Sequence, residues 1–201
     1  MHEKAIADLD QLPDRRFFEE VSTGLQHIVE NVTSIESDAR RLTDQRRQRG
    51  AWILRAVAEE EAAKYLILLD AVRCSRGGRR LLAAHLCRFN QHLAKGLYAK
   101  CAYLQSATFG ELRKYIDQER EQYYLDGPND IDWIFRNHIL QHREESFYVD
   151  YVESDREHFW LSPQRYDEPI YKYRPAVIRL VQDLHTVGFS SSAALALIAK
   201  K

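Results

Sequence analysis

Four basic side chains recur at steps of three and four residues in the middle of the chain, namely His85, Arg88, His92 and Lys95. A helix turns by about 100° per residue, so on one continuous helix these side chains share a narrow arc beside an apolar stripe. Cations hold phosphate groups and an imidazole exchanges protons near neutral pH. The arc therefore indicates an RNA or phosphate site in which His92 moves a proton. The alternative is a network of salt bridges to Glu60 and Glu61, because half-buried cations need anionic partners.

A second set of residues that could do chemistry lies in segment 136–142. Arg136 is followed six positions later by His142, and this pairing fits metal-free RNA cleavage. The guanidinium can hold the scissile phosphate while the imidazole takes the 2′-hydroxyl proton. His138 and His142 are also four residues apart, which suits a metal, but Ile139 stands where the metal-binding helix signature has Glu. The third interpretation is a set of solvent-facing helix residues. We expect no metal and no cofactor.

Positive charge is concentrated in one interval of the chain. No acidic residue lies between Asp70 and Glu111, and the interval holds Arg73, Arg76, Arg79, Arg80, Arg88, Lys95 and Lys100. Such a run can attract a phosphate backbone. It can equally be a solvated face that pairs with the acidic segment 144–168. The net charge of −1 over 201 residues argues against a general nucleic-acid coat.

The amino-acid composition excludes several classes of protein. A hydrophobic content of 45% excludes wholesale disorder, and 8 glycines with 5 prolines are few for an all-β sandwich. Three cysteines, no CxxC and a polar start predict a reducing cytoplasm. The most apolar stretch, 51–72, is interrupted by charges such as Glu60 and Lys64, so we expect a buried helix and no membrane span. Phosphate-binding glycine loops, GxSxG and dinucleotide fingerprints are absent.

The spacing of apolar residues predicts that helices position these side chains. The predicted helices span residues 21–42, 50–73, 79–105, 109–124, 131–145, 175–187 and 192–199. The second is apolar nearly all round and should lie centrally. Segment 147–152 has the composition of a strand and allows at most a two-stranded ribbon. We predict an all-α antiparallel bundle, with a polar segment at 1–20 and a single domain at 21–199.

Several short motifs follow one another along this predicted bundle. A helix of small residues ends in Glu60-Glu61-x-x-Lys64, and Phe89-x-x-His92-x-x-Lys95 comes next. Segment 143–151 then reads Arg-Glu-Glu-Ser-Phe-Tyr-Val-Asp-Tyr, with a Trp and a Pro after it, and a Ser-rich cap with a short helix follows Gly188. In order and spacing these segments resemble the AbiV family of abortive infection proteins over about residues 21–199. Glu145 stands where that family has Lys.

The resemblance implies a HEPN-like bundle with a short C-terminal helical appendage, usually a homodimer, in bacterial defence against phage. Many HEPN proteins are metal-independent ribonucleases that use Arg-x(4–6)-His at a dimer cleft. Arg136 and His142 fit that spacing, whereas Arg88 and His92 are one residue short. The recurrent residues of the AbiV family are instead Glu60, Glu61, Lys64, His92, Lys95, Arg143, Tyr148 and Asp150. Several HEPN proteins are binding modules without catalysis.

The sequence therefore predicts a phage-defence effector that cuts RNA or blocks translation. The alternative is a non-catalytic module that binds a phage protein or an antitoxin-like partner. The candidate catalytic residues are His92, Lys95, Arg136, His142 and Arg143. The candidate RNA-binding or phosphate-binding residues are Arg79, Arg80, Arg88, Lys64 and Tyr148, with Glu60, Glu61 and Asp150 in support.

Two further predictions concern geometry and assembly. The AbiV-like residues Glu60, Glu61, Lys64, His92, Lys95, Arg143 and Tyr148 should converge on one polar site. A homodimer is expected because the helix at 51–72 is too apolar for the edge of a bundle, unless other helices of the same chain cover it.

Overall fold

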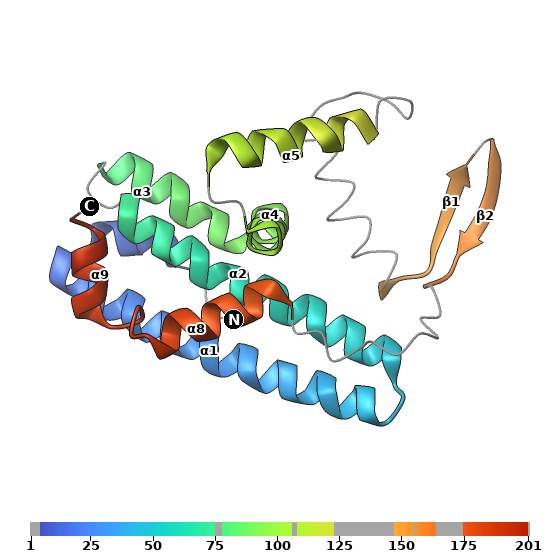
Figure 1. Cartoon of the computed structure of the whole chain (residues 1–201), viewed down its shortest axis with the longest axis horizontal. Coiled ribbons are helices and arrows are strands. Elements are labelled where there is room, and N and C mark those ends of the chain that lie inside the picture. The colour runs from blue at the N-terminus through green and yellow to red at the C-terminus, as the bar shows by residue number, and fades with distance from the viewer. Residues whose placement is uncertain are drawn as a thin grey trace.

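The computed structural model describes residues 5–74, 78–105, 108–122, 147–154, 156–163 and 175–200. Two long antiparallel helices, α1 (Asp14–Asp44) and α2 (Gln48–Cys74), form its spine (Figure 1). α1 begins ahead of the predicted run at Val21, because Phe17 and Phe18 extend its buried stripe by another turn. The all-α prediction is confirmed in the described ranges, where helices form the whole core.

α2 lies at the centre of the bundle, as its composition predicts. It contacts α1, α3 (Arg79–Leu86), α4 (His92–Leu104), α8 (Ala176–Thr186) and α9 (Ser192–Ile198). Its buried side chains are Ala51, Arg55, Ala58, Ala62, Ala63, Tyr65, Ile67, Leu68, Ala71 and Val72. The other helices of the chain therefore cover most of α2, and its apolar composition needs no second copy to explain it.

The single helix predicted for 79–105 is wrong. The chain forms α3 (Arg79–Leu86), a 3-10 turn η3 (Cys87–Asn90) and then α4 (His92–Leu104). Gln91 takes an extended backbone with φ −91° and ψ 120°, which ends the helical path. In Figure 1, α4 is seen nearly end-on while α2 and α3 run across the view, so the break turns the chain sharply. Because of this break, His85 and Arg88 do not share one arc with His92 and Lys95.

A short 3-10 helix, η1 (Ile6–Gln11), packs on α3, and α5 (Phe109–Gln122) follows α4.

Strands β1 (Asp150–Ser154) and β2 (Glu157–Leu161) pair as an antiparallel ribbon, with Tyr151 opposite Trp160. The sequence allowed a two-stranded ribbon near 147–152, and the structure has one at 150–161. The helix predicted at 131–145 lies outside the described residues. No helix in the described ranges is both long and apolar enough to cross a membrane.

The C-terminal helices α8 (Ala176–Thr186) and α9 (Ser192–Ile198) close the bundle over α1 and α2. Gly188, with φ +87°, ends the α8 region, and the Ser191 side chain caps α9. Buried Ser190 ties these parts together: its Oγ lies 2.6 Å from His185 Nδ1 and 2.9 Å from the Tyr65 hydroxyl. Its carbonyl accepts a 2.6 Å hydrogen bond from Ser22 Oγ on α1.

Candidate functional site

Glu60, in the middle of α2, is the hub of a polar cluster. Its Oε2 accepts a hydrogen bond from His92 at 2.7 Å and from Lys95 Nζ at 2.6 Å. His92 is the first residue of α4 and Lys95 lies one turn on, so both side chains approach α2 from the start of α4. The break at Gln91 therefore positions this cluster, in place of the predicted antiparallel pair of helices.

The contact with Glu60 fixes how the His92 ring is protonated. A carboxylate only accepts, so Nδ1 of His92 must carry the hydrogen. Nδ1 then cannot also accept from Lys95 Nζ, which lies 3.3 Å away. The other ring nitrogen, Nε2, makes no hydrogen bond within the described part of the chain, and the side chain is 46% exposed. Nε2 is thus the atom that can exchange a proton with another molecule.

Lys95 and Glu60 form a largely buried ion pair, with side-chain exposures of 7% and 21%. Burial raises the pKa of Glu60, but the hydrogen bonds and charges of Lys95 and His92 outweigh it. The pKa therefore lies below the usual 4.5. Glu60 stays ionised near neutral pH and can stabilise a positive charge on His92.

Glu61 and Lys64 form a second pair one step along α2. Lys64 Nζ donates to Glu61 Oε2 at 2.6 Å and lies 5.1 Å from the centre of the Phe89 ring, on the turn before α4. The structure thus brings Glu60, His92 and Lys95 into direct contact and sets Glu61 and Lys64 beside them.

The other AbiV-like residues are not joined to this cluster by a described contact. Tyr148 is 54% exposed and packs edge-on against Phe147, and Asp150 begins β1. Arg79 and Arg80 are exposed at the start of α3. The candidates Arg136, His142 and Arg143 lie outside the described residues.

A second polar network joins His85 and Arg88 to Tyr98 and Asp70, which the sequence motifs did not single out. Tyr98 donates to Asp70 Oδ2 at 2.6 Å and lies 3.2 Å from His85 Nε2. Arg88 donates to His85 Nδ1 at 2.8 Å. His85 is therefore neutral with its hydrogen on Nε2, and burial together with the Arg88 charge lowers its pKa. The predicted arc placed Arg88 beside both His85 and His92, and its described hydrogen bond goes to His85.

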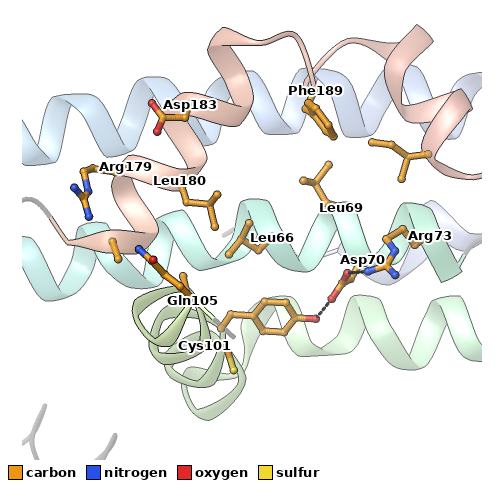
Figure 2. Close-up of a pocket in the computed structure, with 14 residues that line it drawn as sticks. Leu66, Leu69, Asp70, Arg73, Cys101, Gln105, Arg179, Leu180, Asp183 and Phe189 are labelled. Carbon is orange, nitrogen blue, oxygen red and sulfur yellow. Dashed lines mark hydrogen bonds and ion pairs between the residues drawn. The ribbon is translucent and has the colours of Figure 1, made fainter. Parts of the chain in front are cut away.

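Tyr98 and Asp70 also face an open groove of about 770 Å³ between α2, α4 and α8. Figure 2 shows Asp70 and Arg73 at one end, Arg179 at the other, and leucines between them. Burial and the hydrogen bond to Asp70 raise the pKa of Tyr98 far above its usual value, so the phenol stays protonated. This groove does not include the Glu60 cluster.

A third charged group joins α1 to α2. Arg40 donates to buried Glu36 at 3.1 Å, while Arg55 and Glu59 approach from α2. Glu36 Oε2 and Arg55 Nε are buried without a hydrogen-bond partner. Burial raises the pKa of Glu59 to about 7, although the Arg55 charge opposes this. Within the described ranges, no cluster of three or more His, Cys, Asp or Glu side chains could hold a metal ion.

The matched family model can now be compared with the fold, in which α2 is central and Glu60 contacts His92 and Lys95. A sequence model of the AbiV branch of HEPN proteins matches residues 20–180. The chain belongs to the AbiV family. Searches of curated proteins and of solved structures found no match. AbiV proteins are abortive infection proteins, so membership indicates a role in defence against phage. The Glu60 cluster lies inside the matched range.

Proposed function

We propose that this AbiV protein is a cytoplasmic abortive-infection effector that cleaves RNA without a metal, with His92 as the group that moves the proton. One observation carries the proposal. His92 is anchored through Nδ1 to an ionised, largely buried carboxylate, while its other nitrogen has no described partner. An imidazole oriented by a carboxylate is the usual arrangement of a general base.

In the proposed reaction, Nε2 of His92 takes the proton of a ribose 2′-hydroxyl as O2′ attacks the adjacent phosphorus. The P–O5′ bond breaks with its electron pair on O5′, which takes a proton from water. The imidazolium returns its proton to the resulting hydroxide. The products are a 2′,3′-cyclic phosphate and a 5′-hydroxyl end. Glu60 stabilises the imidazolium, and Lys95 holds Glu60 in place.

The phosphate would be held by cations near the start of α4. Arg88 lies in the turn that precedes His92 and is exposed, and its bond to His85 uses only one guanidinium nitrogen. Arg79 and Arg80 extend this positive surface along α3, and Lys64 lies beside the cluster. Arg136, His142, Arg143 and Tyr148 remain proposed contributors, with Arg136 and His142 as the rival catalytic pair.

The test uses the purified full-length protein and total RNA in the presence of EDTA. We expect cleavage by the wild type and a loss of about 10²–10⁴-fold in rate for His92→Ala, the usual effect of losing a proton-transfer group. Glu60→Gln should also lower the rate, because the amide no longer carries the charge that stabilises imidazolium. His142→Ala tests the rival pair in the same assay.

The matched control is His27→Ala on α1. His27 is 74% exposed and lies 3.5 Å from Glu30, far from the cluster in sequence, so its loss should leave the rate unchanged. Cleavage that requires an added divalent metal, or a His92→Ala variant as active as the wild type, would contradict the mechanism. Growth and phage protection of cells expressing the same variants link the chemistry to defence.

The ion pair between Lys95 and Glu60 in the same cluster favours a second, non-catalytic function. Lys95 and Glu60 satisfy one another, and such a pair supports a fold without any chemistry. A non-catalytic module would bind a phage protein or an antitoxin-like partner, or block translation by binding. It would retain phage protection in His92→Ala and lose it in Arg79→Ala or Arg80→Ala. Protection without any RNA cleavage would select this function.

We also propose that the protein works as a homodimer. HEPN domains often dimerise, and the family assignment brings that expectation to this chain. Light scattering at micromolar concentration tests it, and a monomer would reject it.

A further inference from the structure

The β1–β2 ribbon has no helix against either of its faces among the described residues. Ahead of β1, Arg49 on α2 donates a hydrogen bond to the Phe147 carbonyl at 3.2 Å. Tyr151 and Trp160, an opposed pair, are 59% and 69% exposed, and their rings lie 5.1 Å apart. Phe159, on the opposite face, is 43% exposed. An isolated two-stranded ribbon is only marginally stable in water. Exposed aromatic side chains of this kind indicate a surface that binds a partner.

The ribbon combines these aromatic rings with negative charge. Segment 150–161 contains four carboxylates and one arginine. Glu153 lies on the same face as Tyr151 and Trp160, and its described ion pair, to His158, is long at 3.7 Å. Exposed aromatic faces beside carboxylates are the chemistry that recognises arginine, through cation–π contacts and ion pairs. The negative charge argues against a phosphate backbone as the occupant.

The complementary surface is on the same chain, at the start of α3. Arg79 and Arg80 are exposed and have no ion pair within the described ranges, and Leu81 beside them is 51% exposed. The positive end of a helix dipole favours acidic residues, but α3 begins with two arginines and has no acidic residue in its first turn. In Figure 1, α3 begins at one end of the bundle and the ribbon lies beyond the other end, so one chain cannot join the two surfaces.

We infer that the ribbon of one copy grips the Arg79-Arg80-Leu81 surface of a second copy. A two-fold axis across the long direction of the bundle brings each ribbon to the α3 end of the other copy, so both contacts form at once. The aromatic pair supplies apolar area and a stacking face for arginine, and the carboxylates select the basic partner. This inference rests on the homodimer proposed above and names its contact surface.

The experiment measures the mass of the full-length protein by light scattering across micromolar concentrations. A ribbon variant combines Glu153→Lys, on the Tyr151–Trp160 face, with Glu157→Lys, on the opposite face at the start of β2, and so makes this end of the ribbon positive. Like charges then meet at both contacts, as they do in an α3 variant with Arg79→Glu and Arg80→Glu. Each variant alone should dimerise at least about tenfold more weakly than the wild type, because like charges across an interface are repulsive. Mixing the two variants should restore the dimer, since both contacts are then of opposite charge.

The restored dimer also demonstrates that each variant is folded. A matched reversal on α1, Glu20→Lys with Glu30→Lys, should leave the dimer intact. Dimeric wild type with both variants equally dimeric overturns the ribbon contact but not the dimer. Monomeric wild type overturns both, while the cleavage mechanism is tested separately by His92→Ala on total RNA. Loss of RNA binding by the α3 variant without loss of dimer would assign the arginines to nucleic acid and overturn the inference.

Discussion

Glu59 offers a quantitative test of how α1 and α2 pack, because its carboxyl group is held against buried charge. It lies one residue before Glu60, about 100° away around α2, and its charge interactions are with Arg55 and Glu36. Burial is the main cause of its raised pKa, the charge of Glu36 adds to it, and Arg55 opposes it. Glu59→Gln keeps the size of the side chain and removes its titration.

The sign of the effect follows from the direction of the shift. Between pH 4.5 and about 7 the carboxyl group is ionised in the unfolded chain and protonated in the folded one. The unfolded chain therefore binds fewer protons, and stability falls as the pH rises through this window. Each pKa unit corresponds to about 1.4 kcal/mol, so the rise from 4.5 to about 7 costs the wild type about 3 kcal/mol above pH 7.

The assay is urea unfolding of wild type and Glu59→Gln from pH 4 to pH 8.5. We expect the variant to gain about 3 kcal/mol relative to the wild type across this range, because all other titrations cancel in the difference. Glu30→Gln, an exposed change on α1, should show a flat difference. A flat difference for Glu59→Gln as well would refute the burial of this carboxyl group between α1 and α2.

Three further outcomes are expected. Lys95→Met should cost about 1–3 kcal/mol at pH 7, because Glu60 loses the ion pair and hydrogen bond from the Lys95 ammonium. Since the Glu60 pKa is lowered, that cost should shrink as the pH falls below 4.5 in the same urea titration. Tyr65→Phe should cost about 0.5–1.5 kcal/mol through the lost bond to Ser190, as measured by chemical denaturation. Leu86→Ala, at a fully buried position, should cost about 2–5 kcal/mol and lower the melting temperature without changing RNA cleavage rates below it.

Apolar spacing predicted most of the helices, and most clearly α1, α2 and α8, which each bury several apolar residues. α1, α2, α5, α8 and α9 all lie where the 3.6-residue period predicts them. The same period wrongly predicted one continuous helix through Gln91. The apolar residues on either side of Gln91 keep the helical spacing, but the backbone at Gln91 is extended. No Gly or Pro lies at that break. Tertiary packing of α3 and α4 on α2 overrides the local pattern there.

The Glu60 cluster was expected from the order of motifs, but the geometry assumed for it was wrong. One arc on one helix would align His85 with His92, whereas the structure gives each a different carboxylate on α2. His85 reaches Asp70 through Tyr98, and His92 contacts Glu60 directly. Spacing along the chain cannot reveal which turn of α2 each side chain meets, because that depends on the angle introduced at Gln91.

That angle also determines which histidine is available for chemistry. His85 lies inside the bundle, accepts from Arg88 and donates toward Tyr98, so both ring nitrogens are occupied and its lowered pKa keeps it neutral. His92 stands at the first position of α4, half-exposed, with one nitrogen fixed by Glu60. A continuous helix would have given the two rings equivalent surroundings. The break at Gln91 instead makes one a structural residue and leaves the other with a ring nitrogen that has no hydrogen bond among the described residues, as proton transfer requires.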